Sequence, residues 1–248
     1  MSTIKTCRIL GVNIAVTDMD QTVQYIENNL DELRGKYICV SNVHTTVMAH
    51  DNAQYRNVQN SAAIALPDGK PLSVVSRKRG YSEAERVTGP DLMGELFARE
   101  NGLKHFFYGD KEETLQILQQ KLKEKYPHLK IAGMISPPFR SLSKEEENAY
   151  IQQINDSGAD IIWVGLGAPK QENWMYEHQG MLHGVMIGVG AGFSYHAGLI
   201  KRAPAWMQKM SLEWLYRLMQ DPIRLFKRYF TTNLKFLLLE ANDKGEAL

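Results

Sequence analysis

Residues with reactive side chains follow several of the apolar runs in this sequence. In parallel α/β proteins, ligand-binding side chains lie at such positions, just beyond the strand ends. Asp68 follows the apolar run Ala62–Leu66 and precedes a glycine in the segment LPDGKP. A carboxylate at such a point is suited to act as a general base that takes a proton from a hydroxyl group. The alternative is that Asp68 forms a turn with Gly69 or caps a helix. The spacing alone slightly favours this alternative over a catalytic role.

A second polar group follows the apolar run Tyr37–Ser41, in the segment VSNVHTT. Asn42 is expected to hydrogen-bond a hydroxyl or phosphate group of a ligand. Thr45 has a hydroxyl for the same purpose, or else caps the helix that follows.

The segment GLGAPKQE lies between an apolar run and a helical pattern. Gly165 and Gly167 let the backbone approach a ligand closely, and free N–H groups at a helix start favour phosphate. The spacing does not name the ligand. Three side chains are then expected to project toward it: Lys170, Gln171 and Glu172.

The run Gly188–Gly192, with Gly190 at its centre, resembles the glycine fingerprint of NAD-binding proteins. That fingerprint belongs after the first strand of its fold, with an acidic residue about 20 positions on. Here the run follows the last apolar segment and precedes a basic one. Tight packing of a loop beside the ligand site is the better interpretation.

The chain ends in a basic stretch. Residues 201–239 contain eight Lys/Arg and two Asp/Glu, whereas the rest of the chain carries 21 basic and 26 acidic residues. Helical positions starting at Pro222 place Arg224, Arg228 and Lys235 on one face and aromatic and aliphatic residues on the other. This helix is expected either to lie on an anionic bilayer or to pack on the body and bind phosphates, with Arg217 alongside.

These residues need a scaffold, and short apolar runs that alternate with helical patterns supply one. The alternation predicts a Rossmann-like, mostly parallel sheet with helices on both faces, followed by a C-terminal helical appendage. The predicted units are residues 1–200 and 201–248. The expected strands are Cys7–Ile9, Tyr37–Ser41, Ala62–Leu66, His105–Tyr108, Lys130–Ile135, Asp160–Gly165 and Gly184–Val189. The expected helices are 18–33, 90–99, 110–125, 143–156, 169–178, 206–219 and 222–240. Asp110 is expected to cap the third of them, and Ser143 with Glu146 forms a capping box at the start of the fourth.

Bulk properties exclude several classes. The 248 residues include 44% hydrophobic and 23% charged side chains, and the net charge of +1 argues against nucleic acid as a partner. Two cysteines without CxxC spacing indicate neither a zinc site nor a disulfide framework, and no metal or cofactor is expected. The N-terminal residues do not read as a signal segment, and no apolar run approaches the ~20 residues of a membrane span. We therefore expect a cytoplasmic protein, peripheral at the inner face of the cell membrane.

Five segments resemble the WecG/TagA/CpsF glycosyltransferase family in order and spacing. They are NVHTTVMAH, PDGKP, ERVTGPDLM, GLGAPKQENW and GVGAGFSYHAGLIKRAPAWMQKMSLEWLYRLMQDPIRLFKRY. The resemblance covers about residues 11–236. It implies an inverting, metal-independent enzyme that forms a β-linkage, with a UDP-sugar donor and a polyprenyl-diphosphate-linked sugar acceptor. Its products are cell-surface polymers such as teichoic acid, capsule or exopolysaccharide.

The resemblance also implies roles for individual residues. The family's catalytic base falls on Asp68, its strand-end asparagine on Asn42 and its glutamine on Gln171. The basic residues of its appendage, which hold a diphosphate, fall on Arg217, Arg224 and Arg228, and Arg202 opens the same basic stretch.

This sequence departs from the family pattern near the expected ligand cleft. PDGKP has Lys70 and Pro71 where the family has PDG-x-G, Ser194 follows Phe193 where the family has aspartate, and Val40 replaces a threonine. These departures argue against N-acetylmannosamine as the donor sugar and leave glucose, galactose or a uronic acid, whose carboxylate Lys70 could meet.

Two rival interpretations stay open. One is an NAD-dependent nucleotide-sugar oxidoreductase or epimerase, and the other is a non-catalytic scaffold at the membrane surface. The aromatic face of the last helix is also suited to pairing with a second copy of the chain, so a homo-oligomer is a further option.

Overall fold

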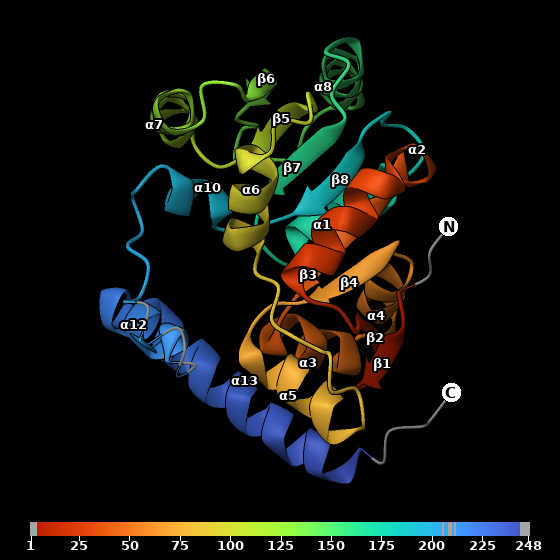
Figure 1. Ribbon diagram of the computed structural model, residues 1–248, viewed down its shortest axis with the longest axis vertical. Coiled ribbons are helices and arrows are strands. Elements are labelled where there is room, and N and C mark those ends of the chain that lie inside the picture. The colour runs from red at the N-terminus through yellow and green to blue at the C-terminus, as the bar shows by residue number, and fades with distance from the viewer. Residues whose placement is uncertain (1–3, 205, 208–209, 211, 244–248) are drawn as a thin grey trace.

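The scaffold is an eight-stranded sheet in the order β1-β2-β4-β3-β8-β7-β5-β6, covered by helices on both faces (Figure 1). The computed structural model describes residues 4–204, 206–207, 210 and 212–243, except for the side chains of residues 223–229. Every neighbouring pair is parallel except β1 with β2. The predicted α/β class is confirmed.

The strands coincide with the apolar runs to within about two residues. They are β1 Thr6–Ile9, β2 Val12–Ala15, β3 Tyr37–Ser41, β4 Ile64–Pro67, β5 Lys104–Gly109, β6 Lys130–Ile135, β7 Ile161–Gly165 and β8 Val185–Gly188. The first described helices are α1 Met19–Asn28, α2 Leu30–Leu33, α3 Val43–Asp51, α4 Ala53–Asn60, α5 Lys70–Lys78 and α6 Gly89–Ala98. The others are α7 Glu112–Lys125, α8 Lys144–Asp156, α9 Lys170–Glu177, α10 Gly192–His196, α12 Glu213–Gln220 and α13 Pro222–Asn242.

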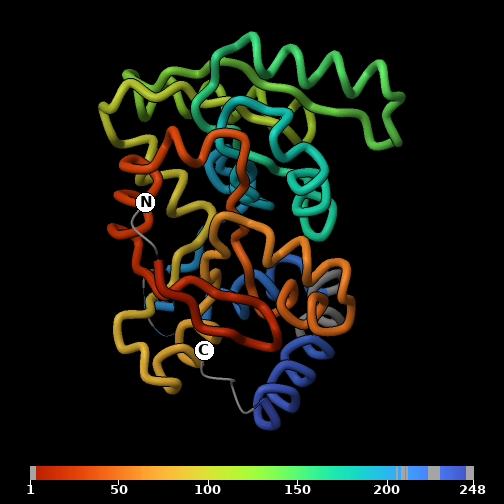
Figure 2. Tube along the Cα trace, turned by 90° about the vertical axis from the view of Figure 1, so that its right-hand side faces the viewer, coloured from red at the N-terminus to blue at the C-terminus, as the bar shows by residue number. Residues whose placement is uncertain are grey.

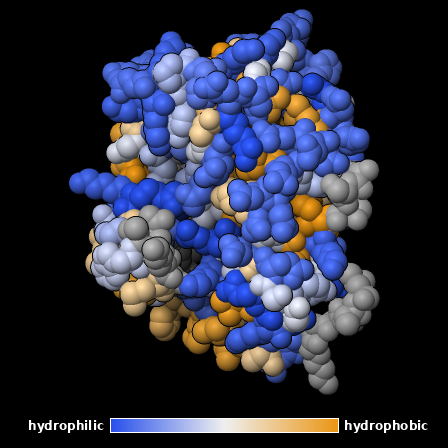
Figure 3. Space-filling view, viewed as in Figure 1, coloured by the Kyte–Doolittle hydropathy of each residue, from blue (hydrophilic) through white to orange (hydrophobic). Residues whose placement is uncertain are grey.

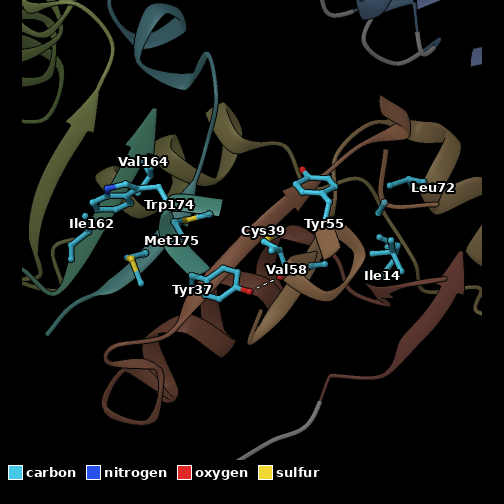
Figure 4. Close-up of a cluster of buried hydrophobic side chains, with 14 of the residues drawn as sticks. Ile14, Tyr37, Cys39, Tyr55, Val58, Leu72, Ile162, Val164, Trp174 and Met175 are labelled. Atoms are coloured by element: carbon cyan, nitrogen blue, oxygen red, sulfur yellow. Dashed lines mark hydrogen bonds between the residues drawn. The ribbon is translucent and has the colours of Figure 1, made fainter. Parts of the chain in front are cut away.

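Strand residues alternate between two apolar cores, one on each face of the sheet. In β3, Tyr37 and Cys39 face one core while Ile38 and Val40 face the other. The first core also receives Tyr55 of α4 and Trp174 and Met175 of α9 (Figure 4). The second receives apolar side chains of α1, α6, α7 and α10. Because helices cover both faces of the sheet, we expect the site to lie at the ends of the strands.

Local capping signals explain several helix boundaries. The Ser143–Glu146 capping box that starts α8 is present as predicted. The single helix expected from 18 to 33 is wrong in one respect, because Asn29 leaves helical geometry and separates α1 from α2. Asp110 was also expected to cap α7, but its backbone is left-handed (φ 58°) and Lys111 is the N-cap.

The strand β2 was not predicted. It forms an antiparallel hairpin with β1 through Leu10 and Gly11, which both have positive φ. This conformation suits a two-residue hairpin turn. Its strand β2 pairs in parallel with β4, so the hairpin extends the sheet beyond β4.

The last helix runs along the edge of the body and ends beside the β1–β2 hairpin (Figure 2). Phe236 is buried against the first core, and Lys235 pairs with Asp51 of α3 at 2.6 Å. At its end, the Asp243 carboxylate accepts the Leu10 N–H at 3.0 Å, and Arg79 pairs with Asp243 at 3.1 Å. The last two turns of α13 and the residue that follows are therefore held against the body.

Candidate active site

The strand-end residues Asp68 and Asn42 meet at one edge of the sheet. Strands β3 and β4 are parallel neighbours in which Ser41 pairs with Pro67, so the residues that follow leave the sheet together. The Asp68 N–H donates to the Ser41 carbonyl at 2.7 Å, and the Asn42 side chain hydrogen-bonds the Asp68 carboxylate. The sheet register thus places an amide beside a carboxylate.

Helix capping fixes the orientation of the Asn42 amide. Its Oδ1 accepts the N–H groups of His44 and Thr45 at 3.0 and 3.2 Å, which leaves the NH₂ group for Asp68. The Thr45 hydroxyl closes the same capping box by accepting the Asn42 N–H, and Thr45 is only 1% exposed. Of the two roles left open for Thr45, the structure shows the cap rather than a ligand contact.

The Asp68 carboxyl has an unusual acidity. Its pKa is raised to about 6, chiefly by burial and also by the negative charge of Glu213. Arg86, Arg217 and the hydrogen bond from Asn42 act in the opposite direction. A carboxyl with this pKa is ionised at neutral pH yet basic enough to accept a proton.

Four charged side chains form an ion-pair cluster beside Asp68. Arg86 contacts Glu213 at 2.7 Å, and Arg202 contacts the same carboxylate at 3.1 Å. Arg202 also holds Asp91 with two hydrogen bonds of 2.7 and 3.2 Å. Because Glu213 is the first residue of α12, this cluster joins the appendage to the body.

The arginines predicted to bind a diphosphate lie in different environments. Arg202 is engaged with Asp91 and Glu213, so in this structure it serves the cluster. Arg217 stands 5.5 Å from the Tyr195 ring, which Arg202 also approaches at 5.5 Å. Arg224 and Arg228 belong to α13, and their side chains lie outside the described residues.

The glycine loops after β7 and β8 are joined by Gln171. Its Oε1 accepts the N–H of Gly167 at 3.2 Å and that of Gly190 at 3.0 Å. The loop that begins at Gly165 thus presents fewer free N–H groups to a phosphate than the sequence suggested. Gly165 itself is held tightly, because a Cβ on it would come within 2.8 Å of the Phe193 ring.

The polar residues at the start of α9 point in different directions. Lys170 is exposed, as expected for a side chain that projects from the loop. The expectation that Glu172 projects toward a ligand is wrong for this structure, because Glu172 is 1% exposed and accepts a hydrogen bond from Gln171 at 2.8 Å. Lys70, predicted to meet a sugar carboxylate, opens α5 two residues after Asp68 and is half-buried.

Sequence reasoning missed four residues near the site. Arg86 and Asp91 lie in the segment ERVTGPDLM but were given no role, because their partners Glu213 and Arg202 are more than 100 residues away in sequence. Asp110 lies at the end of β5, where its carboxylate accepts the Ser194 hydroxyl at 3.0 Å. Its position after an apolar strand is the signal that could have found it.

The described part of the chain has neither a metal-binding cluster nor a membrane-spanning helix. Residues 4–243, without the gaps stated above, contain no group of three His, Cys, Asp or Glu side chains placed to hold a metal ion. In the same residues no helix is long and apolar enough to cross a membrane.

A buried carboxyl group beside arginines, at the carboxyl ends of parallel strands, is suited to activating a hydroxyl group next to an anionic substrate. The model of the glycosyl transferase WecG/TagA/CpsF family matches residues 7–246. The chain is 30% identical over 212 residues to the N-acetylglucosaminyldiphosphoundecaprenol N-acetyl-β-D-mannosaminyltransferase of Bacillus subtilis, with 84% of this chain and 81% of that protein covered. The Bacillus spizizenii enzyme of the same name is 29% identical, with 84% and 80% covered. The chain belongs to the WecG/TagA/CpsF family and is a glycosyltransferase.

Proposed function

We propose that this glycosyltransferase moves a sugar from a UDP-sugar to a sugar carried on a polyprenyl diphosphate, in the synthesis of a cell-surface polysaccharide. The observation that carries the proposal is Asp68, oriented by Asn42 and flanked by the charged residues of the appendage. The two Bacillus relatives are named for a β-mannosaminyl transfer to a diphosphoundecaprenol-linked sugar. We carry over the class of donor and acceptor from them, and not the identity of the sugars.

In the proposed reaction Asp68 is the catalytic base. Its carboxylate takes the proton of the acceptor hydroxyl, whose oxygen forms a new bond to the anomeric carbon of the donor sugar. The bond from that carbon to the UDP oxygen breaks on the opposite face, so the configuration inverts to β. The electron pair leaves with UDP, and Arg217 stabilises the developing negative charge together with Arg224 and Arg228.

The sheet topology supports a place for the donor nucleotide. The strand β5 leads through α7 to β6 on one side, whereas its neighbour β7 leads through α9 to β8 on the other. Ligands bind in the crevice at such a switch point. We place the nucleotide there, beside Asp110 and the loop from Gly165 to Lys170. Three strand spacings of about 4.8 Å each, roughly 14 Å, separate β7 from β4. An extended nucleotide-sugar can bridge that distance and present its sugar to Asp68.

The donor sugar is the least defined part of the proposal. Lys70 stands at the first turn of α5, two residues from Asp68, where the family pattern does not require a cation. A uronic acid would complement Lys70, and glucose and galactose are the uncharged alternatives. A panel of UDP-sugars, with UDP-N-acetylmannosamine included, separates these donors.

We further propose that the enzyme works at the cytoplasmic membrane surface through α13. Thr232 and Phe236 face the body, whereas four apolar side chains of the same helix are exposed: Phe230, Leu234, Leu237 and Leu238. Hydrophobic side chains gather along this lower edge of the molecule (Figure 3). Together with the basic residues of α13, such a face fits an anionic lipid surface that also carries the prenyl acceptor.

The NAD-dependent alternative has little structural support. The glycine run follows β8 and opens α10, which has only five residues, and the Gly190 N–H is used by Gln171. The scaffold alternative predicts that Asp68 is dispensable, which mutation can test.

The experiment that tests the proposal measures UDP release from a panel of UDP-sugars, with and without a short-chain prenyl-diphosphate-linked N-acetylglucosamine. Release that depends on the acceptor, with one donor preferred, supports the reaction class and names the donor. Release without acceptor, or from none of the pairs, contradicts the proposed reaction.

A further inference from the structure

A chain of buried polar side chains crosses the first core beneath the site. From the end of β3, the Ser41 hydroxyl donates to Gln59 Oε1 at 2.5 Å, and Gln59 Nε2 donates to the Tyr55 hydroxyl at 3.0 Å. The Tyr55 hydroxyl in turn lies beside the Glu172 carboxylate, whose Oε2 has no hydrogen-bond partner among the described residues. We call these residues, with Gln171, the polar relay.

A second arm of the relay reaches Glu172 from the glycine loops. The N–H groups of Gly167 and Gly190 donate to Gln171 Oε1, and Gln171 Nε2 donates to Glu172 Oε1 at 2.8 Å. Both arms therefore end at the same carboxylate, whose pKa is raised by burial. Because Glu172 Oε1 accepts the hydrogen bond from Gln171 Nε2, it turns the Gln171 amide so that Oε1 faces the glycine loops.

Such an arrangement is costly in a protein core. None of the five relay side chains is more than 4% exposed, and the relay is surrounded by Tyr37, Cys39 and Met175. Figure 4 shows Tyr55 and Met175 on either side of Cys39. Buried polar groups destabilise a fold unless all are paired, and an apolar set of the same shape is often at least as stable. What the hydrogen bonds of such a network add is a defined geometry.

The two ends of the relay touch the two halves of the site. At one end, the Ser41 carbonyl accepts the Asp68 N–H, and the adjacent Asn42 orients the Asp68 carboxylate. At the other end, Gln171 holds together the loops after β7 and β8. The sheet alone does not fix the distance between these loops and Asp68, because the loops lie beyond its hydrogen-bonded edge.

We propose that Tyr55, Gln59 and Glu172 are positioning residues for sugar transfer, which hold the Gln171 amide and with it the donor-side loops in register with Asp68. The proposal rests on the proposed function, because it takes the glycine loops as part of the donor site. None of the three side chains needs to touch the substrate.

The test compares variants that differ by single polar atoms. Tyr55→Phe removes one relay hydroxyl, Glu172→Gln replaces the carboxylate at which both arms end by an amide, and Gln59→Met interrupts the same arm as Tyr55→Phe at another residue. The matched control is Tyr37→Phe, which removes another buried hydroxyl, one that donates to the Val58 carbonyl outside the relay. Thermal unfolding, kcat and the KM for the donor are measured for each.

We expect the relay variants to lower kcat by about tenfold or more and to raise the donor KM, at a loss of thermal stability similar to that of Tyr37→Phe. The control should keep the kinetics of the wild type. Relay variants with wild-type kcat and KM would overturn the proposal and leave a structural network only. If Glu172→Gln does not fold, Tyr55→Phe and Gln59→Met decide the matter.

Amide hydrogen exchange provides a readout that requires no turnover. Exchange at the loops 165–168 and 188–192 should be faster in Tyr55→Phe than in both the wild type and Tyr37→Phe. Faster exchange in a protein that transfers no sugar would refute the proposed function and keep the relay. Unchanged exchange at both loops would refute the relay whatever the enzyme does.

Discussion

Glu213 and Arg86 form an ion pair of 2.7 Å, although 127 residues separate them in the sequence. Glu213 opens α12 of the appendage, whereas Arg86 belongs to the segment between α5 and α6 of the body. The charge of the same carboxylate also raises the pKa of Asp68. Docking of the appendage therefore affects the pKa of the proposed base.

Asp68→Asn should lower kcat by about 10²- to 10⁴-fold while donor binding is largely kept, because the base is lost and the shape is not. The same substitution should stabilise the fold by on the order of 1–2 kcal/mol at neutral pH. UDP-release kinetics and urea unfolding check the two effects together. Near-normal rates would disprove the assignment of the base.

The stability gain has a defined pH dependence. Asp68 has an ordinary pKa of 3.8 that is raised to about 6 in the folded protein, so its ionisation costs stability only above that ordinary value. The advantage of Asp68→Asn should be absent below pH 3.8, grow as the pH rises and be complete above about 6. An advantage that is constant across this range would point to an effect other than the Asp68 charge.

Transfer activity should rise with pH through a limb near pH 6, because Asp68 must be ionised to accept a proton. Glu213→Gln should move this limb to lower pH, since it removes a negative charge near Asp68 and leaves Arg86 less neutralised. The control is Glu240→Gln, which removes a carboxylate of the appendage that pairs with Arg79 instead. Profiles of kcat/KM against pH give the answer, and an unmoved limb in Glu213→Gln would contradict the coupling.

Truncation after Ala203 should abolish transfer and leave a folded but less stable body. Loss of Glu213 and Arg217 removes charges from the site, and loss of Phe236 uncovers part of the first core. Circular dichroism and activity are compared with Arg217→Ala, which keeps the appendage in place. An unfolded product would show that residues 1–200 are not a separate unit.

The double substitution of Leu237 and Leu238 by serine should weaken binding to anionic vesicles by at least about tenfold, because both side chains are exposed on α13. Flotation with vesicles of phosphatidylglycerol and phosphatidylcholine measures this. Met181→Ser is the control, since Met181 is an exposed apolar residue elsewhere. Unchanged flotation with a loss of self-association would indicate that the face pairs with a second copy.

Gly109→Ala should destabilise the protein by roughly 2–4 kcal/mol. A Cβ at this position would lie 2.6 Å from the Gly165 carbonyl carbon, and Gly109 has a φ of 129°. Gly80→Ala is the matched control, because Gly80 also has a positive φ (96°) but no atom within 4 Å of its Cβ. Both substitutions strain a backbone of positive φ, so the difference between their urea midpoints measures the clash with Gly165. Equal losses of stability in the two variants would mean that the contact with Gly165 can relax.

The parts of the fold that local chemistry determines were predictable. The capping box of Ser143 and Glu146 places the start of α8, and the buried run Ile161–Gly165 is identified as a strand by its apolar residues. The hairpin partner Val12–Ala15 was not, because its pairing with β1 depends on Leu10 and Gly11 adopting positive φ. Left-handed Asp110 was taken for a cap for the same reason: sequence patterns carry little information on φ.

The candidate site likewise contains some residues that could be placed from the sequence and others that could not. Asp68 and Asn42 could be placed from their positions after strands, since parallel strands end at a common edge. The pairing of Arg202 with Asp91 and the burial of Glu172 could not, because they depend on side chains more than 100 residues away in sequence. Whether a polar residue faces ligand or core is decided by such tertiary contacts.

The contact of Asp243 with the β1–β2 turn has a consequence for the order in which the enzyme becomes active. It joins two residues 233 positions apart. Forming this contact directly from the unfolded chain would close a loop of almost the whole chain, which has a high entropic cost. Contacts between residues so far apart in sequence are expected to form later in folding than local ones. The body is thus expected to fold with its catalytic edge open, and activity should appear in a second, slower phase when the last helix docks.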